Sequence, residues 1–431
     1  MQVHRFASLG VLVLALSGCG GIRNGARFGP SIQPDSAAAP EFSVAPGRYS
    51  LPQTVRISPA IPQALVYYTT DGTEPTASSR IYGGPITVNT NITLKAIAIK
   101  DDTASKMATA EYFIDPSHES VSDTPVPDVF VRDSGSKDAF QVLKWAGFKS
   151  ALTYSYDDGF IQQIRDYPKL QATNTRMTFY LICRSEHDPA TWAQAVKDGH
   201  ELGNHTVHHC HSDGTCGPGV TWSGSVAAEY DECTNYLKER YGLEDVWTTA
   251  SPFGDRGYVP VAKTRFFLNR GTIQGQIGVN GGADPFFLNA YVAKTGDGVF
   301  VFKQMIDLAE QHGRWQIFSF HSLDDGYDWV NVDDLIASIN HAKSKKDVWI
   351  DSVVNVGAYW IGQQAASNGT KTVTRNGVMI SWTLPNHFPT GKFVRVTTNL
   401  RTLKQNGAMI PRNPAGYYEV ALDPGNLTVS R

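Results

Sequence analysis

The chain is poor in charge, and its few charges nearly balance. Charged residues make up 18% of the 431 residues, below the roughly 25% of an average soluble protein. Lysine and arginine number 38 against 41 aspartates and glutamates, so the formal charge is −3. This balance argues against a nucleic-acid-binding protein that works through general electrostatics. Hydrophobic residues reach 41%, which is enough to build sizeable cores and excludes disorder of the whole chain.

The chain also lacks an apolar run long enough to cross a bilayer, which needs roughly 20 residues. A short apolar stretch at 9–16 follows Arg5, and we expect residues 1–18 to be a secretory signal peptide. The sequence LSGC at 16–19 resembles a bacterial lipobox, in which the cysteine is lipidated. An ordinary signal peptide is the alternative. We therefore expect an exported protein at the cell envelope, anchored to a bacterial membrane only by acyl chains on Cys19, or otherwise secreted.

Cysteine is scarce, at five residues in the whole chain. If Cys19 is lipidated, four remain: Cys183, Cys210, Cys216 and Cys233. Four cysteines in an oxidising compartment predict two disulfides, and only the second and third of them are close enough in sequence to close a small loop. The connectivity stays open. The rival interpretation is a metal site, because His208, His209 and His211 lie beside these cysteines.

The N-terminal third has the composition of a tether followed by a β domain. Residues 19–41 are rich in Gly, Ser, Ala and Pro, which predicts a flexible tether. Residues 42–115 carry short alternating runs between turn signals, which is typical of strands. The string YYTTDGTEPT at 67–76 resembles the C-terminal β-sandwich domain family of chitobiase and β-hexosaminidase. We interpret this domain as a spacer; the alternative is glycan binding through Tyr67, Tyr68 and Tyr82.

The pattern changes after a second linker at 116–138. Residues 139–365 alternate strand-like runs with helical spacing, for example a strand at 151–156 and a helix at 227–240. Such alternation predicts an α/β domain with a mostly parallel sheet or barrel. Residues 370–431 return to short strands and predict a small β domain, to which we assign no function.

The first polar cluster of the α/β region is Asp157-Asp158-Gly159, directly after an apolar strand. Active sites of α/β folds lie at the carboxyl ends of their strands. Two adjacent carboxylates point in different directions as the chain leaves a strand, so one can bind a metal while the other stays free as a base. For this cluster alone, a solvated turn is the alternative.

The second cluster is rich in histidine: five of the twelve lie between residues 200 and 211. His205 and His209 are four apart and would share one face of a helical turn. Two imidazoles and a carboxylate are the ligand set of a catalytic zinc. His208 is the alternative to His209 as ligand, and we expect His200 and His211 to be bystanders.

The third cluster is an apolar strand at 317–320 that ends in His321. A histidine at the rim of a sheet can act as a general acid at physiological pH. A purely structural histidine is the alternative.

Taken in order, Asp-Asp-Gly, HTVHH at 205–209, SPFG at 251–254 and a strand ending in His321 resemble the NodB-type polysaccharide deacetylases, carbohydrate esterase family 4. The resemblance covers about residues 139–365. It implies a distorted (β/α) barrel that hydrolyses N-acetyl or O-acetyl groups on glycans. We expect a divalent metal as cofactor, with zinc first among the candidates.

The resemblance also implies a role for each matching residue. Asp157 would be the catalytic base, His321 the acid that protonates the leaving group, and the backbone N–H of Phe253 an oxyanion donor. The implied metal ligands are Asp158, His205 and His209.

Two positions depart from the family pattern. The family has an arginine where this chain has Ala250, and that arginine normally pairs with the catalytic carboxylate. Arg270, at the end of another apolar run, is a possible charge partner in its place; its alternative is a plain surface arginine. The tryptophan-containing fourth motif is not recognisable, and Asp284 is a weak candidate for orienting His321.

These residues predict an enzyme that removes acetyl groups from an acetylated polysaccharide. The leading substrate class is an N-acetylated polymer such as chitin-like glycan, peptidoglycan or an exopolysaccharide. An O-acetyl esterase on xylan and a non-catalytic surface glycan-binding protein are the alternatives. The sequence leaves the polymer, the native metal and the oligomeric state open.

Overall fold

The computed structural model describes residues 38–44, 46–49, 53–101, 103–114, 124–127, 140–185, 188–375, 377–398, 402–413 and 415–430. The predicted signal peptide, Cys19 and most of both linkers lie outside these ranges, so the expectations about them stay predictions. None of the helices in the described ranges is both long enough and apolar enough to span a membrane. The chain divides into two compact units, one containing Ile92–Tyr112 and the other Phe113–Arg431.

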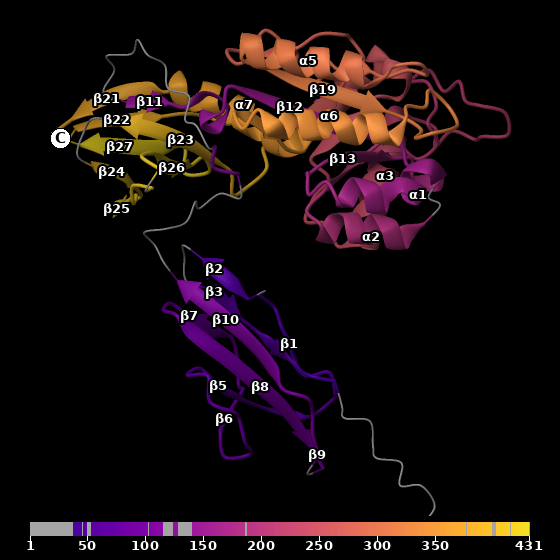
Figure 1. Ribbon diagram of the computed structural model, residues 1–431. Helices are drawn as coiled ribbons and strands as arrows, with labels where there is room; N and C mark the ends of the chain where they lie inside the picture. Colours follow the sequence, from indigo (N-terminus) through magenta and orange to yellow (C-terminus); the bar gives the residue numbers. More distant parts are fainter. Residues whose placement is uncertain are drawn as a thin grey trace, which may run out of the picture. The chain divides into compact units, whose positions relative to one another are not determined.

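The N-terminal unit is built from short strands, as the alternating runs predicted (Figure 1). Its largest sheet has the order β2-β10-β8-β5-β6, and β9 pairs with β8. Along β8, Leu94, Ala96 and Ala98 are buried and alternate with partly exposed neighbours, the period-2 pattern of a strand with one face on a core. The strands are β1 (Glu41–Phe42), β2 (Gly47–Tyr49), β3 (Gln53–Val55), β4 (Ile57–Ser58), β5 (Leu65–Thr69), β6 (Arg80–Ile81), β7 (Ile86–Val88), β8 (Ile92–Lys100), β9 (Thr103–Ala104) and β10 (Ala108–Ile114).

The three tyrosines considered for glycan binding do not share one face. Tyr68 and Tyr82 pack against the small core and meet edge to face, with ring centroids 6.4 Å apart. Tyr67 is the direct partner of Ile81 across the strands, on the opposite side of β5 from Tyr68. Because successive side chains of a strand point to opposite faces, Tyr67 and Tyr68 could not contact a glycan on the same face; glycan binding through these tyrosines stays a prediction.

The second unit contains a nine-stranded, mostly parallel sheet that curves into an open, distorted barrel. Its order is β16-β15-β14-β13-β12-β19-β17, with β20 paired to β12 and β18 to β19. The predicted (β/α) fold of the NodB type is confirmed. The strands are β12 (Ser150–Asp158), β13 (Thr178–Leu181), β14 (Glu201–Asn204), β15 (Thr248–Ala250), β16 (Leu268–Arg270), β17 (Ile277–Gly278), β18 (Tyr291–Val292), β19 (Arg314–Phe320) and β20 (Val348–Ile350).

Helices cover the outside of this sheet, with α5 and α6 over β12, β19 and β20 (Figure 1). They are α1 (Ile161–Gln171), α2 (Pro189–Lys197), α3 (Val226–Tyr241), α4 (Val259–Ala262), α5 (Val299–His312), α6 (Val332–Ser344) and α7 (Val353–Ser367), with short 3₁₀ turns η1 (Lys144–Gly147), η2 (Cys183–Ser185), η3 (Pro252–Gly254) and η4 (Arg256–Tyr258). α3, predicted from its spacing, begins where the Ser225 hydroxyl accepts the N–H of Ala228 and ends before Gly242, whose φ of 65° is left-handed.

The predicted C-terminal β domain is present and shares its core with the barrel. Two sheets form it, with the orders β11-β23-β26 and β21-β22-β27-β24-β25. Ile380, Val394 and Leu427 belong to the same buried cluster as Trp360 of α7 and Trp315 of β19. The strands are β11 (Phe140–Val142), β21 (Thr370–Thr374), β22 (Gly377–Ser381), β23 (Phe393–Thr398), β24 (Thr402–Gln405), β25 (Ala408–Met409), β26 (Tyr418–Ala421) and β27 (Asn426–Ser430).

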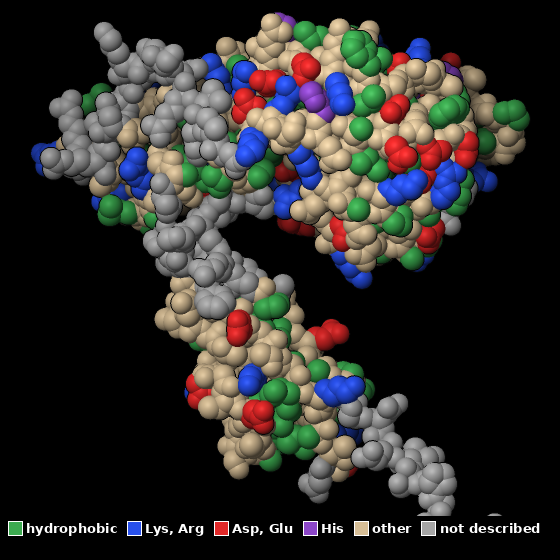
Figure 2. Space-filling view, in the orientation of Figure 1, with side chains coloured by type: hydrophobic (Ala, Val, Ile, Leu, Met, Phe, Trp, Pro, Cys, Tyr) green, Lys and Arg blue, Asp and Glu red, His purple; other side chains and the backbone are tan. Residues whose placement is uncertain are grey.

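Acidic and basic side chains are interspersed over the visible face of the barrel and do not gather into a patch of one sign (Figure 2). This mixture agrees with the near-zero formal charge of −3. A surface of this kind does not hold polyanions by general electrostatics.

Candidate metal and catalytic site

The carboxyl ends of four strands of one sheet bring the predicted polar clusters together. β12 ends in Asp157 and Asp158, His205 follows β14, β16 ends in Arg270, and His321 follows β19. Because these strands run parallel in one sheet, with β13 and β15 between them, their carboxyl ends meet at one edge. There they line a cavity of about 650 Å³ together with Phe160, Ile182, His209, Ser251, Phe253, Gly254, Thr272, Val292, Lys294, Tyr327 and Asp328.

Asp158, His205 and His209 converge with ligating atoms within 4.8 Å of one another. The Asp158 Oδ1 atom lies 3.3 Å from Nε2 of His205 and 3.5 Å from Nε2 of His209. That oxygen is buried and has no hydrogen-bond partner among the described residues. A buried carboxylate oxygen left without a donor and faced by two imidazoles fits a divalent cation, so these residues are suited to hold one.

The second nitrogen of His205 fixes the ring in the form that binds a metal. Its Nδ1 lies 2.9 Å from the carbonyl oxygen of Ala250. A carbonyl can only accept, so Nδ1 carries the proton and Nε2 presents its lone pair toward Asp158. The backbone carbonyl of Ala250, at the position where the family has arginine, therefore orients the imidazole of His205.

Burial and neighbouring charges shift the two imidazoles in opposite directions. Burial would lower the pKa of His205, but the nearby carboxylate of Asp158, followed by that of Asp157, outweighs burial and raises that pKa. Burial, followed by the neighbouring His205, lowers the pKa of His209 to about 4. His209 is therefore neutral at neutral pH, which is the protonation state of a metal ligand.

Three residues of the cluster adopt left-handed backbone conformations: Asp158 (φ 74°), Thr206 (φ 68°) and His209 (φ 53°). For a β-branched residue such as threonine this is an outlier. Each such residue costs on the order of 1–3 kcal/mol and persists only where its surroundings fix it. Here the Thr206 hydroxyl accepts the N–H of His209 at 3.0 Å, and the Asn204 side chain accepts the N–H of Thr206 at 2.8 Å.

Asp157 lies outside the ligand triad and pairs with Arg270, whose guanidinium contacts both carboxylate oxygens. The Ser319 hydroxyl donates to Oδ2 at 3.1 Å. Burial alone would raise the pKa of Asp157, but Arg270, with smaller contributions from His205 and His321, lowers it to about 2. The sequence offered Arg270 as a charge partner or a surface residue, and its side chain is 1% exposed.

His321 lies across from this carboxylate, with Nε2 3.9 Å from Oδ2 of Asp157. The amide of Gln163 donates to the backbone carbonyls of Asp157 (2.6 Å) and His321 (2.8 Å), which ties the two strand ends together. Tyr327 approaches the imidazole edge to face, with ring centroids 5.2 Å apart. Nδ1 of His321 has no hydrogen-bond partner among the described residues, and Asp284 accepts the N–H of Phe286, so the suggested role of Asp284 in orienting His321 is wrong.

Phe253 lines the same cavity from η3 and has a left-handed φ of 57°. Its side chain is 58% exposed and lies at the cavity rim. The ring stacks on His211 with centroids 4.1 Å apart and meets His209 at 4.4 Å. His211 therefore supports the rim through Phe253 and contributes no atom to the ligand triad.

The remaining histidines of the cluster have structural partners. His208, the alternative ligand, points to Glu229, with 2.8 Å between Nδ1 and Oε1. His200 accepts the backbone N–H of Met177 at 3.0 Å. His208 is therefore turned away from the triad, and the alternative in which it replaces His209 is wrong.

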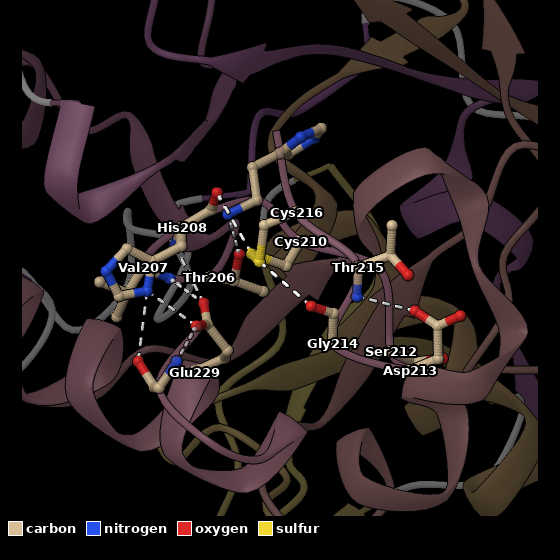
Figure 3. Close-up of a disulfide and its surroundings, with 12 residues drawn as sticks. Thr206, Val207, His208, Cys210, Ser212, Asp213, Gly214, Thr215, Cys216 and Glu229 are labelled. Carbon is tan, nitrogen blue, oxygen red and sulfur yellow. Dashed lines mark hydrogen bonds and ion pairs between the residues drawn. A yellow bond between two sulfur atoms is a disulfide. The ribbon is translucent and has the colours of Figure 1, made fainter. Parts of the chain in front are cut away.

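The four described cysteines form two disulfides, Cys183–Cys233 and Cys210–Cys216. The first joins η2 to α3, and the second closes the loop that follows His209 (Figure 3). Paired sulfurs carry no thiolate, so the rival interpretation of the cysteines as metal ligands is wrong.

Sequence reasoning missed several residues that position the site. Ser319 precedes His321 by two residues and so faces the same side of its strand, a signal that alternation could have supplied. Glu229 gave no such signal, because it reaches the loop from α3, 21 positions after His208. Gln163 and Tyr327 lie close in sequence to Asp157 and His321, but neither is on a strand, so alternation does not point to them.

An open, mostly parallel barrel brings two carboxylates and three imidazoles around one cavity, and three of these groups could hold a metal ion; such an arrangement suits a hydrolase. Residues 149–264 match the family model described as polysaccharide deacetylase, and residues 44–110 match that of the chitobiase/beta-hexosaminidase C-terminal domain. The chain therefore carries a polysaccharide deacetylase domain of carbohydrate esterase family 4, with a domain of the second family on its N-terminal side.

Individual relatives are distant. The chain is 28% identical to gellan lyase from Bacillus sp over 135 residues, which is 31% of this chain and 5% of gellan lyase. Among solved structures, T48 deacetylase with substrate is 16% identical, with 50% of this chain and 94% of that chain covered and a TM-score of 0.36. A family 4 acetyl xylan esterase from Clostridium thermocellum is 14% identical, with coverages of 48% and 89% and a TM-score of 0.34.

Proposed function

We propose that this protein is a metal-dependent deacetylase that removes acetyl groups from an N-acetylated polysaccharide at the outside of the cell. One observation carries the proposal: the Asp158, His205 and His209 triad shares a cavity with a second carboxylate, Asp157, and with His321. This is the set of groups that amide hydrolysis needs, namely ligands for an electrophile, a base and an acid.

The metal site would be formed by one oxygen of Asp158 and the Nε2 atoms of His205 and His209. A divalent ion bound there, zinc first among the candidates, would polarise the acetyl carbonyl and lower the pKa of water. Three protein ligands leave positions open for water and substrate. Left-handed backbone at Asp158 and His209 aims these side chains inward and keeps them there.

Asp157 would act as the base. It is adjacent in sequence to the proposed ligand Asp158, but its carboxylate contacts Arg270 and Ser319. Both of its oxygens therefore remain outside the triad. Its lowered pKa of about 2 keeps it ionised at neutral pH and able to accept a proton from water. We infer that Arg270 replaces the arginine that the family has at the position of Ala250.

Phe253 and His321 would act on the two ends of the breaking bond. The backbone N–H of Phe253, at the cavity rim, would stabilise the oxyanion, a contribution of about 3–4 kcal/mol in other hydrolases. His321 would donate a proton to the departing sugar amine. An amide needs this step more than an ester does, because an amine anion is the poorer leaving group.

The test is acetate release from a panel of acetylated glycans by the purified mature chain. We expect release from N-acetylated oligosaccharides, its loss after EDTA treatment, and its recovery when zinc is added back. Release only from acetylated xylan would select an O-acetyl esterase. No release from any member of the panel, with glycan binding retained, would contradict an enzymatic function and favour a binding protein.

The cellular location is a separate part of the proposal. We propose that Cys19 is lipidated and that the tether and the β-sandwich hold the enzyme away from the membrane. A Cys19→Ser variant should move from the membrane fraction to the medium on cell fractionation. A variant that stays with the membrane would contradict the lipid anchor without affecting the proposed chemistry.

A further inference from the structure

The loop between the two histidine ligands has to satisfy its own backbone in an unusual conformation. It runs from His205 to His209, and both Thr206 and His209 are left-handed. The N–H groups of Val207 and His208, at the middle of the loop, are not part of a helix or strand. Backbone donors in such a partly buried place need an acceptor, and the residue that supplies it determines the path of the loop.

Glu229 supplies that acceptor from the first turn of α3 (Figure 3). Its Oε2 accepts the N–H of Val207 at 3.1 Å and that of His208 at 2.9 Å. Its Oε1 accepts the N–H of Ser223 at 3.0 Å and faces Nδ1 of His208 at 2.8 Å. One carboxylate thus holds the loop by two backbone bonds and one side-chain bond.

The charge of Glu229 makes this contact costly to lose. Its side chain is 0% exposed, and among the described residues no lysine or arginine forms an ion pair with it. Burial would raise its pKa, but the N–H of Ser223 and the contacts with His208 outweigh burial and lower it. The three N–H groups and the imidazole therefore replace the water around this carboxylate, and such charge-assisted bonds are stronger than neutral ones.

The two ends of the loop have other supports. The Asn204 amide donates to the backbone oxygen of Tyr230 at 2.9 Å, which fixes the start. At the far end, the Tyr258 hydroxyl donates to the carbonyl of Cys210 at 2.7 Å, and the disulfide to Cys216 closes the following turn. In the middle of the loop, the carbonyls of Thr206 and Val207 accept backbone N–H groups from η2, at 3.1 and 3.2 Å. Glu229 is the side chain that accepts the N–H groups of Val207 and His208, directly between the ligands.

We propose that Glu229 is a positioning residue for the metal: it holds the 205–209 loop in the conformation that brings the two imidazoles together. The proposal rests on the proposed function only in so far as the triad binds a metal. Residues behind metal ligands change affinity by about 10–100-fold when mutated, and the same range is expected here, although Glu229 touches neither ligand side chain.

The experiment compares metal affinity in three full-length proteins: wild type, Glu229→Gln and Glu232→Gln. Glu232 is a matched control, because it lies on the same helix, is exposed and, within the described part of the chain, hydrogen-bonds only to the Ser223 hydroxyl, at 3.2 Å. Apo-proteins are titrated with Co²⁺, followed by visible absorption, and Zn²⁺ affinity is measured by competition with a chelator. We expect at least tenfold weaker binding and an altered Co²⁺ spectrum for E229Q, with E232Q within twofold of wild type.

The outcomes separate this inference from the proposed function. Equal affinity and an identical cobalt spectrum in folded E229Q would overturn the positioning role, and so would an equal loss in E232Q. If E229Q does not fold, Glu229→Asp, which keeps the charge but withdraws the oxygens, carries the same expectation, and wild-type affinity in E229D overturns it. A wild-type protein that binds cobalt but releases no acetate would contradict the proposed function alone.

Discussion

The second unit contains two buried pairs of an arginine and a carboxylate, and the surroundings of the two pairs differ. Arg270 pairs with Asp157 at the cavity, and Arg395 pairs with Glu419 in the C-terminal β domain; both arginine side chains are 1% exposed. Arg395 and Glu419 are direct cross-strand partners on β23 and β26. Burying a charge pair costs several kcal/mol in desolvation, so each pair needs further partners to be tolerated.

The two arginines differ in how many of their N–H groups have a hydrogen-bond acceptor. Arg395 donates through Nε to Glu419 at 3.1 Å, through Nη1 to the carbonyls of Pro125 and Ala146, and through Nη2 to that of Thr124, and it lies over the ring of Tyr417. Arg270 reaches Asp157 and the carbonyl of Gly271, but its Nε has no hydrogen-bond partner among the described residues. A saturated pair fixes structure, whereas a pair left partly unsatisfied beside a cavity keeps its carboxylate available for chemistry.

The largest contrast is expected when each carboxylate becomes an amide. Asp157→Asn removes the base while keeping the shape, so acetate release should fall by about 10²–10⁴-fold, the usual contribution of a general base. Its zinc content should stay at the wild-type level, because Asp157 is outside the triad. Steady-state kinetics and metal analysis of the purified variant check both statements.

Glu419→Gln is the matched variant for that experiment. It should keep the specific activity of the folded protein and lose stability instead. A fall in zinc content in D157N would show that the roles of the two adjacent aspartates had been assigned wrongly. A loss of activity in folded E419Q would end the contrast between the pairs.

The next effect is on stability, at Arg395. Arg395→Met leaves Glu419 buried without its cation and removes the donors that hold Thr124, Pro125 and Ala146. Breaking one side of a buried pair costs about 3–5 kcal/mol, and we expect that loss in urea unfolding. The double variant R395M/E419L, which removes both charges, should recover part of it; no recovery would mean that the backbone bonds of Arg395, and not its charge, carry the stability.

A smaller effect is expected at Arg270. In Arg270→Met, Asp157 keeps the Ser319 hydroxyl and the nearby His321. We therefore expect less destabilisation than at Arg395, together with a fall in kcat of about 10–100-fold as the base loses its orientation. The exposed Arg256→Met is the control. Full activity in R270M would remove Arg270 from the mechanism.

The smallest effect is expected at a partly exposed cluster, where Glu310 lies 2.6 Å from both Lys149 and Lys345. Hydrogen bonds from these lysines lower the pKa of Glu310 below its ordinary value of 4.5. The unfolded chain therefore takes up the proton first as the pH falls, so the stabilisation is present above about pH 4.5 and is lost below it. Glu310→Gln should cost less than about 1 kcal/mol at pH 7 because Lys149 is well solvated, and the cost should vanish at low pH. A cost that persists below pH 3 in urea unfolding would point to packing.

The fold class and the candidate residues of the site could be predicted from local sequence patterns. Strand–helix alternation indicated the α/β class, and the placement of Asp157, Asp158 and His321 at strand ends required only that parallel strands end at the same edge. The spacing of His205 and His209 correctly predicted that the two imidazoles lie together, but the helical turn assumed for it is wrong. They follow β14 in a loop with left-handed residues and are not on one face of a helical turn.

The sequence by itself determined which side chains were candidates for metal ligands, acid and base, because these residues stand in short motifs at or near the ends of strands. Only the tertiary structure decided their partners. Arg270 meets Asp157, and Glu229 meets the 205–209 loop, through contacts that join residues 113 and 21 positions apart. Such contacts depend on the order of strands in the sheet and on where α3 packs, and the free energy that selects them comes from burying the whole core and not from any local motif.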